Sequence, residues 1–204
     1  MQKLFTAAGW QLASEISAAS AVVVNTCTVT AVSSQKSRQM IRRAVSANSD
    51  CVLAVVGCYA QSEPEEISKI DGVDVIIGTK DRTRIVELVE LALSRRGEKI
   101  LRVGDVEDIR EFEELPHSPH RTRAFLKIED GCNNFCTYCI IPYVRGRVRS
   151  RSLASIRAEC LALKAAGYKE IVLTGIHIGA YGRDLSGQWS VVSGQKISPW
   201  YKID

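Results

Sequence analysis

The chain has 204 residues, of which 46% are hydrophobic and 25% are charged, with a formal net charge of +4. This composition excludes bulk disorder and allows an ordinary buried core in one large domain or two small ones. No apolar run approaches the roughly 18 residues that a membrane span requires. Gln11 and Glu15 interrupt the only stretch that resembles a signal peptide. We therefore expect a cytoplasmic protein with no membrane contact.

Short apolar runs alternate with helical patterns through the first half of the chain. Residues 21–24, 52–56 and 73–77 are predicted to be buried strands. Helices are predicted from residue 33 or 34, as the N-cap, to about 47, and over residues 81–95 with Asp81 as the N-cap. Strands that alternate with helices predict a parallel α/β sheet, in which ligands gather at the carboxyl ends of the strands.

Two cysteines follow strands of this predicted sheet. Cys27 comes after the first strand and Cys58 after the second, so both are expected at one edge, where they can converge as metal ligands. The alternative is a pair of packed free thiols, the interpretation that suits Cys51 and Cys160 better. Two thiolates alone do not complete a site of three cysteines.

A polar stretch over residues 104–123 contains two prolines and a cluster of acidic residues. It is predicted to be a linker whose acids serve only solubility. A second α/β unit follows, with strands at 124–128 and 170–174 around a helix at 153–166 that Ser152 caps. The tail after residue 184 has no periodicity, which favours an irregular segment or the product of a shifted frame. Two strands and one helix cannot close a barrel, so the second unit looks incomplete.

Three cysteines form the most specific motif of the chain. Cys132, Cys136 and Cys139 have the spacing C-x3-C-x2-C on one loop. Three thiolates suit a four-iron cluster in which one iron keeps an open position. A structural zinc site would need a fourth ligand from a second paired motif, and Cys160 and His177 each stand alone. The spacing favours the cluster over the zinc site.

Three motifs taken together resemble the radical S-adenosylmethionine methylthiotransferases: residues 25–30, 57–61 and the loop 132–139. Residues 36–39 and 173–177 make the chain most similar to the branch that acts on threonylcarbamoyladenosine in tRNA. The resemblance implies an N-terminal parallel-sheet methylthiotransferase domain over residues 1–103, with its first strand missing. After the linker it implies the first part of a radical SAM (partial TIM-like) barrel over residues 124–184, and then the tail at 185–204.

The same resemblance implies a reaction and its cofactors. Such an enzyme adds a methylthio group to the adenine of N6-threonylcarbamoyladenosine in the tRNA anticodon loop, with a reductant such as flavodoxin or ferredoxin and a sulfur donor that the resemblance does not name. Cys132, Cys136 and Cys139 are implied to hold a [4Fe-4S] cluster whose open iron chelates S-adenosyl-L-methionine. Tyr138 is implied to lie near the adenine of that cofactor, with packing as its alternative, and Gly175 near the methionine end.

A second [4Fe-4S] cluster is implied in the first domain, where the family uses three cysteines. Cys27 and Cys58 match two of them, and the third has no counterpart in this chain. The chain therefore resembles a piece of such an enzyme, and we expect it to be unable to complete the reaction alone. The alternatives are a non-catalytic iron–sulfur or tRNA-binding fragment, a zinc-stabilised RNA-binding module, or methylthiolation of isopentenyladenosine tRNA or of a ribosomal protein.

Four arginines alternate directly after the cysteine loop: Arg145, Arg147, Arg149 and Arg151. In an extended segment alternate residues share one face, so we expect these guanidinium groups to contact the tRNA backbone or the carboxylate of the cofactor. Arg147 is the candidate for the cofactor. The alternative for each of them is an ordinary solvated loop.

Overall fold

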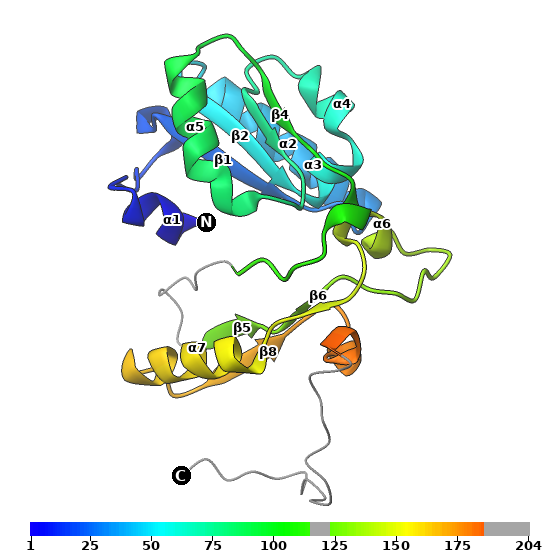
Figure 1. Cartoon of the computed structure of the whole chain (residues 1–204). Coiled ribbons are helices and arrows are strands. Elements are labelled where there is room, and N and C mark those ends of the chain that lie inside the picture. The colour runs from blue at the N-terminus through cyan, green and yellow to red at the C-terminus, as the bar shows by residue number, and fades with distance from the viewer. Residues whose placement is uncertain (115–122, 186–204) are drawn as a thin grey trace, which may run out of the picture.

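A computed structural model of the chain describes residues 1–114 and 123–185 (Figure 1). Its first part is a four-stranded sheet in which every neighbouring pair is parallel and the strands follow chain order. The strands are β1 (Ala21–Thr26), β2 (Val52–Gly57), β3 (Val75–Ile77) and β4 (Ile100–Arg102). The predicted α/β class is thus confirmed. The strand β4 was not predicted, because its three residues, which end in an arginine, are too short an apolar run.

Helices pack on both faces of this sheet (Figure 1). They are α1 (Gln2–Ala7), α2 (Ala31–Ala47), α3 (Cys58–Ser62), α4 (Pro64–Ser68) and α5 (Ile85–Ser94), with short 3-10 turns at Ile16–Ala18, Arg82–Arg84 and Val106–Asp108. The strand β2 is buried on both sides, so alternate residues enter two cores. Leu53 and Val55 pack with Ile41 of α2, whereas Val56 packs with Leu88 of α5.

Two predicted helix starts are wrong by a few residues. The side chain of Thr30, not of Ser33 or Ser34, caps α2 by accepting a hydrogen bond from the Ser33 amide. Asp81 adopts a left-handed backbone with φ of 60° and leads into the Arg82–Arg84 turn, so α5 begins only at Ile85. Residues that can cap a helix are common near its start, and the backbone path selects among them.

The second part of the chain contains two small sheets. The strand β5 (Ala124–Lys127) pairs in parallel with β8 (Ile171–Thr174), and β6 (Glu129–Asp130) pairs antiparallel with β7 (Arg149–Ser150). The helices are α6 (Ile141–Arg145) and α7 (Leu153–Ala165), followed by 3-10 turns at Ile178–Ala180 and Arg183–Leu185. Ser152 caps α7 through the Ser155 amide, as predicted. In Figure 1 α7 runs along β5 and β8.

The acids that precede the undescribed gap have structural partners. Glu113 forms an ion pair with Arg82 at 2.6 Å. Glu114 accepts hydrogen bonds from Arg151 at 2.9 Å and from Ser155 at 2.6 Å. The prediction that these acids serve only solubility is therefore wrong for both residues, which join the connector to the two folded parts. The predicted tail beyond residue 185 and residues 115–122 of the predicted linker, which include both of its prolines, lie outside the described residues.

Within the described ranges, no helix is both long and apolar enough to cross a membrane.

Candidate functional site

Cys27 and Cys58 directly follow two paired strand residues. Thr26 of β1 is the register partner of Gly57 of β2, so Cys27, in the segment after β1, and Cys58, the first residue of α3, lie at one sheet edge. Their predicted shared edge is confirmed, and their role as cluster ligands stays a prediction. Cys58 is buried and Cys27 is exposed.

Hydrogen bonds hold the chain at this edge. The Cys27 amide donates to the hydroxyl of Ser37 on α2 at 3.1 Å, and that hydroxyl donates to the Cys27 carbonyl at 3.0 Å. The Thr26 hydroxyl donates to the carbonyl of Val56 at 2.7 Å. Gly57 has a φ of +103°, and a β-carbon there would lie 2.6 Å from the Thr26 carbonyl oxygen. Only glycine allows this close turn from β2 into α3.

The segment that follows the cysteine loop docks on the same edge. In Figure 1 α6 lies beside α3. Arg145 of α6 donates from Nε to the sulfur of Cys58 at 3.1 Å, and from Nη1 to Asp130 at 3.2 Å. The Thr79 hydroxyl donates to the Val144 carbonyl at 2.7 Å. These contacts connect the strand-end cysteine to the part of the chain that carries the other three candidate ligands.

Asp130 is the centre of a buried charge network. Its carboxylate lies 2.8 Å from Lys127 Nζ and 3.2 Å from Arg145 Nη1, with Arg82 at 3.9 Å and Arg149 at 4.0 Å. Burial acts to raise the pKa of Asp130, but Lys127 and Arg145 outweigh it, and the pKa falls to about 2. Burial lowers the pKa of Lys127 and of Arg149. The network carries more positive than negative charge next to the cysteine loop.

Glu129 supports the turn that contains Gly175. Its side chain is fully buried, and Oε2 accepts a hydrogen bond from the His177 amide at 2.8 Å. A β-carbon at Gly175 would lie 2.7 Å from the same oxygen and 3.2 Å from the Glu129 β-carbon, so a side chain there would displace this carboxylate. Burial raises the pKa of Glu129. The predictions did not include Glu129 or Asp130, although two acids directly before a cysteine motif were a usable signal.

Two hydrogen bonds join the start of the cysteine loop to the segment that follows α6. The Cys132 amide donates to the Gly146 carbonyl at 3.1 Å, and the Asn133 side chain accepts from the Val148 amide at 3.0 Å. Within the loop the Cys139 amide donates to the Cys136 carbonyl at 2.9 Å. Cys132 is buried, and the other two thiols are half-buried.

These residues fit an iron–sulfur cluster by donor chemistry. Three free thiols on one loop are the ligand set that such clusters use. Over residues 1–114 and 123–185 the structure contains no group of three histidine, cysteine or acidic side chains that could hold a metal ion as they stand.

Gly131, which precedes the loop, should not tolerate a side chain. Its φ is +84°, and a β-carbon would lie 2.0 Å from the carbonyl oxygen of Arg147. We expect Gly131→Ala to lower the free energy of unfolding by roughly 2–4 kcal/mol, measured by urea denaturation, because it adds a backbone clash to the strain of a positive φ.

Gly167→Ala is the matched control for that prediction. Gly167 has a φ of +87°, and nothing lies within 4 Å of its β-carbon position. The Gly167→Ala variant should lose only about 1 kcal/mol of its free energy of unfolding, from backbone strain. Equal losses in the two variants would contradict the close approach at Gly131.

The alternating arginines do not form one exposed face. Arg151 is buried and forms ion pairs with Glu114 at 2.9 Å and with Glu159. Arg149 is also buried and donates to the carbonyl oxygens of Arg145 and Arg147. The predicted anion contact is wrong for Arg149 and Arg151, whose guanidinium groups have partners within the fold. Arg147 is exposed, and its guanidinium group lies over the ring of Phe135 in the cysteine loop.

Tyr138 is 89% exposed, so the alternative that it packs in a core is wrong within the described residues. Its predicted position near a bound adenine stays a prediction.

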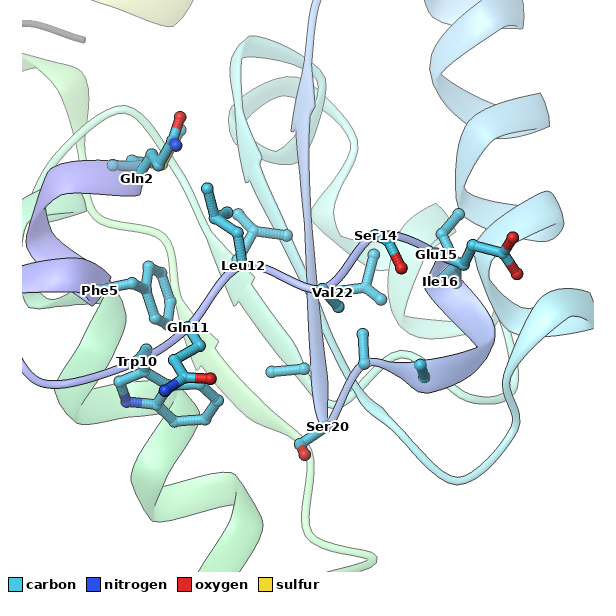
Figure 2. A pocket seen from close by; sticks show the side chains of 16 residues that line it. Gln2, Phe5, Trp10, Gln11, Leu12, Ser14, Glu15, Ile16, Ser20 and Val22 are labelled. Atoms are coloured by element: carbon cyan, nitrogen blue, oxygen red, sulfur yellow. The ribbon is translucent and has the colours of Figure 1, made fainter. Parts of the chain in front are cut away.

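One cavity lies away from all these residues. It measures about 870 Å³ and lies along β1 and the segment before it. Figure 2 shows Phe5 and Trp10 on one side of the strand and Glu15 and Ile16 on the other. A cavity of about 320 Å³ lies between Arg82, Phe112 and Arg149, nearer to the Asp130 network. Because the larger cavity contains no cysteine, we assign the candidate site to the sheet edge and the cysteine loop.

Comparisons with known proteins identify both parts of the chain. Residues 1–78 match the uncharacterized protein family UPF0004, and residues 126–184 match the radical SAM superfamily. The chain is 48% identical over 185 residues to the threonylcarbamoyladenosine tRNA methylthiotransferase MtaB of Bacillus subtilis, a match that covers 90% of this chain and 41% of that protein. It is 37% identical to the protein of the same name from Aquifex aeolicus, over 90% of this chain and 45% of that one.

A relative with another substrate in its name is also similar. The ribosomal protein uS12 methylthiotransferase RimO of Citrifermentans bemidjiense is 38% identical over 89% of this chain and 42% of its own length. The chain thus spans less than half the length of these curated relatives.

Proposed function

This chain belongs to the radical S-adenosylmethionine methylthiotransferases, a family of transferases, and we propose that it is part of an enzyme that adds a methylthio group to N6-threonylcarbamoyladenosine in a tRNA anticodon loop. One observation supports this most: Arg145, directly after the three-cysteine loop, contacts the strand-end Cys58 at 3.1 Å. A reaction that joins radical chemistry to sulfur transfer needs both cysteine sets near each other.

Cys132, Cys136 and Cys139 are the residues that would hold the [4Fe-4S] cluster. With S-adenosyl-L-methionine and one electron from a reductant such as flavodoxin or ferredoxin, that group supplies radical chemistry when bound. The chain's own residues shape its surroundings. Glu129 holds the Gly175–His177 turn against the loop, with the His177 amide at 2.8 Å. Gly175 is therefore the candidate for close backbone approach to the methionine end of the cofactor.

Two further side chains complete this part of the proposal. Tyr138 is the exposed ring that would lie near the adenine of S-adenosyl-L-methionine. Arg147 would pair with the cofactor carboxylate or with a tRNA phosphate, since it is exposed and has no acidic partner among the described residues.

Cys27 and Cys58 would serve a second cluster at the carboxyl edge of the sheet. Their strands are in register there, and Ser37 holds the Cys27 backbone from α2. Neither side chain is in a disulfide. The family resemblance implies a third cysteine ligand, for which this chain has no match.

The substrate assignment rests on similarity. Both MtaB proteins carry threonylcarbamoyladenosine tRNA in their names, and the one from Bacillus subtilis is 48% identical to this chain, against 38% for the ribosomal protein methylthiotransferase. We therefore assign a tRNA adenosine in preference to a ribosomal protein.

Cleavage of S-adenosylmethionine tests the proposal. The chain, reconstituted without oxygen with iron and sulfide and then reduced, should release 5′-deoxyadenosine, measured by chromatography. An anticodon stem-loop carrying threonylcarbamoyladenosine should raise the yield more than the same RNA carrying dimethylallyladenosine, or a peptide of ribosomal protein uS12. Yields no higher than those of Cys136→Ala would reject the enzymatic assignment. Equal stimulation by the three additions would reject the substrate assignment.

A further inference from the structure

Two aromatic rings and a guanidinium group form a continuous exposed row beside the cysteine loop. The ring centroids of Phe135 and Tyr143 are 5.5 Å apart and the ring planes are 83° apart, an edge-to-face contact. The guanidinium carbon of Arg147 lies 5.5 Å from the centroid of Phe135. Phe135 is 39% exposed and Tyr143 is 61% exposed. The row therefore presents ring surface and a positive charge to solvent.

The backbone at Phe135 has a strained conformation. Its φ is +45°, and Asp81 is the other residue besides glycine with a positive φ in the described ranges. A bulky L-residue adopts this region rarely, whereas glycine or asparagine adopts it at lower cost. Strain of this kind is concentrated at functional sites. A phenylalanine in this position is expected where the ring itself has a role.

Tyr143 is presented by an anchored turn. Ile141 and Val144 of α6 are buried, so the opposite side of this short helix faces solvent with Tyr143 on it. The hydrogen bond from Thr79 to the Val144 carbonyl, at 2.7 Å, and the ion pair of Arg145 with Asp130, at 3.2 Å, hold the turn on the rest of the fold. A rigid aromatic surface loses little conformational freedom when it binds a ligand.

We propose that Phe135, Tyr143 and Arg147 form a stacking platform for an unpaired base of a bound RNA, with Arg147 next to the adjoining phosphate. Exposed aromatic rings and arginine are what proteins use to stack single-stranded bases, because every base has a π-face. The proposal deepens the proposed function, on which it rests, by naming the surface that contacts the anticodon loop. Between residues 140 and 157 the sequence has no acid, so this segment itself adds no negative charge that would repel an RNA backbone.

The competing explanation is that the two rings only cover the loop. Rings with that role would affect the stability of the chain, and their removal would leave its affinity for RNA unchanged. The two explanations predict different RNA affinities for variants that lack a ring, and these affinities can be measured directly.

Fluorescence anisotropy with a labelled anticodon stem-loop RNA tests the platform in the full chain. Phe135→Ala and Tyr143→Ala should each weaken binding about 5- to 100-fold, the range for loss of one base–aromatic stack. Tyr143→Phe and Phe135→Tyr should bind within about twofold of the unchanged chain, because they keep the ring. Leu161→Ala, which removes a 57% exposed apolar side chain from α7, is the matched control and should have no effect.

The salt dependence separates stacking from charge. Tyr143→Ala should leave the slope of log Kd against log salt unchanged, whereas Arg147→Ala should reduce its magnitude by about 1, as expected for one phosphate contact. Arg157→Ala, an exposed arginine of α7, should not change the slope. The RNA is also made with 2-aminopurine in place of a loop adenine, so that stacking quenches its emission. This second measurement uses the unchanged chain and does not depend on the folding of any variant.

Unchanged affinity in both alanine variants, or no quenching at any loop position when the unchanged chain binds, would overturn the platform and leave the proposed tRNA function standing. Failure of the unchanged chain to bind the RNA would overturn both, and is recognised without any variant. If alanine weakens binding and the loop base is quenched, the platform is supported.

Discussion

Replacing Cys132, Cys136 and Cys139 together with alanine should reduce the iron and sulfide that the chain takes up at this loop to background. Thiolates are the ligands on which such clusters depend, and three from one loop supply every protein ligand of a cluster with an open iron. The measurement is iron and sulfide content after reconstitution without oxygen, together with the visible absorption of the product. Single replacements should lose most of the same signal.

Two other cysteines provide matched controls. Cys51 is buried at the start of β2 and Cys160 is half-buried on α7. Alanine at either position removes one thiol and should leave the iron content unchanged. Iron that persists in the triple variant at the level of the unchanged chain would contradict the assignment. A fall to background in the Cys51 or Cys160 variant would contradict the choice of ligands.

Asp130→Ala should be the most destabilising single change among those considered. The carboxylate lies 2.8 Å from Lys127 and 3.2 Å from Arg145, and its side chain is 4% exposed. Its loss leaves buried cations without their shared partner, which costs roughly 3–5 kcal/mol. Urea denaturation followed by circular dichroism measures the change in the free energy of unfolding.

The matched control is an ion pair on the surface. Glu87 lies 2.6 Å from Arg84, but the two side chains are 60% and 47% exposed. Glu87→Gln should therefore leave the free energy of unfolding close to that of the unchanged chain, because solvent screens an exposed pair. A similarly small loss in Asp130→Ala would show that water or other groups compensate the cations, and would contradict the central position of Asp130 in the network.

The same network sets a direction for acid denaturation. The pKa of Asp130 is lowered from 3.8 to about 2 because, although burial opposes ionisation, Lys127 and Arg145 stabilise the charged form more strongly. A lowered pKa in the folded state contributes stability that is present above the unfolded value and is lost as the pH falls through about 2. Asp130→Asn should remove this contribution, so the stabilities of the two proteins should converge at the acid end of a pH series.

Local order along the chain was enough to predict much of the candidate site. The spacing of Cys132, Cys136 and Cys139 predicts a candidate ligand loop without any knowledge of the fold, because the three residues are close in the chain. Cys27 and Cys58 were predictable for another reason: parallel strands end at the same edge, so residues that follow neighbouring strands lie at that edge. The Ser152 cap of α7 likewise depends only on residues within one turn.

Contacts between distant residues were decided only by the tertiary structure. The sequence presents Arg145, Arg149 and Arg151 as one alternating series, yet Arg145 contacts Cys58, Arg149 is buried near Asp130, and Arg151 pairs with Glu114. Which partner each arginine finds depends on where α3, β6 and the connector lie in space, and no spacing along the chain encodes that. The charge pattern by itself therefore determined that cations gather after the loop, and the packing of the two parts determined which of them remains exposed.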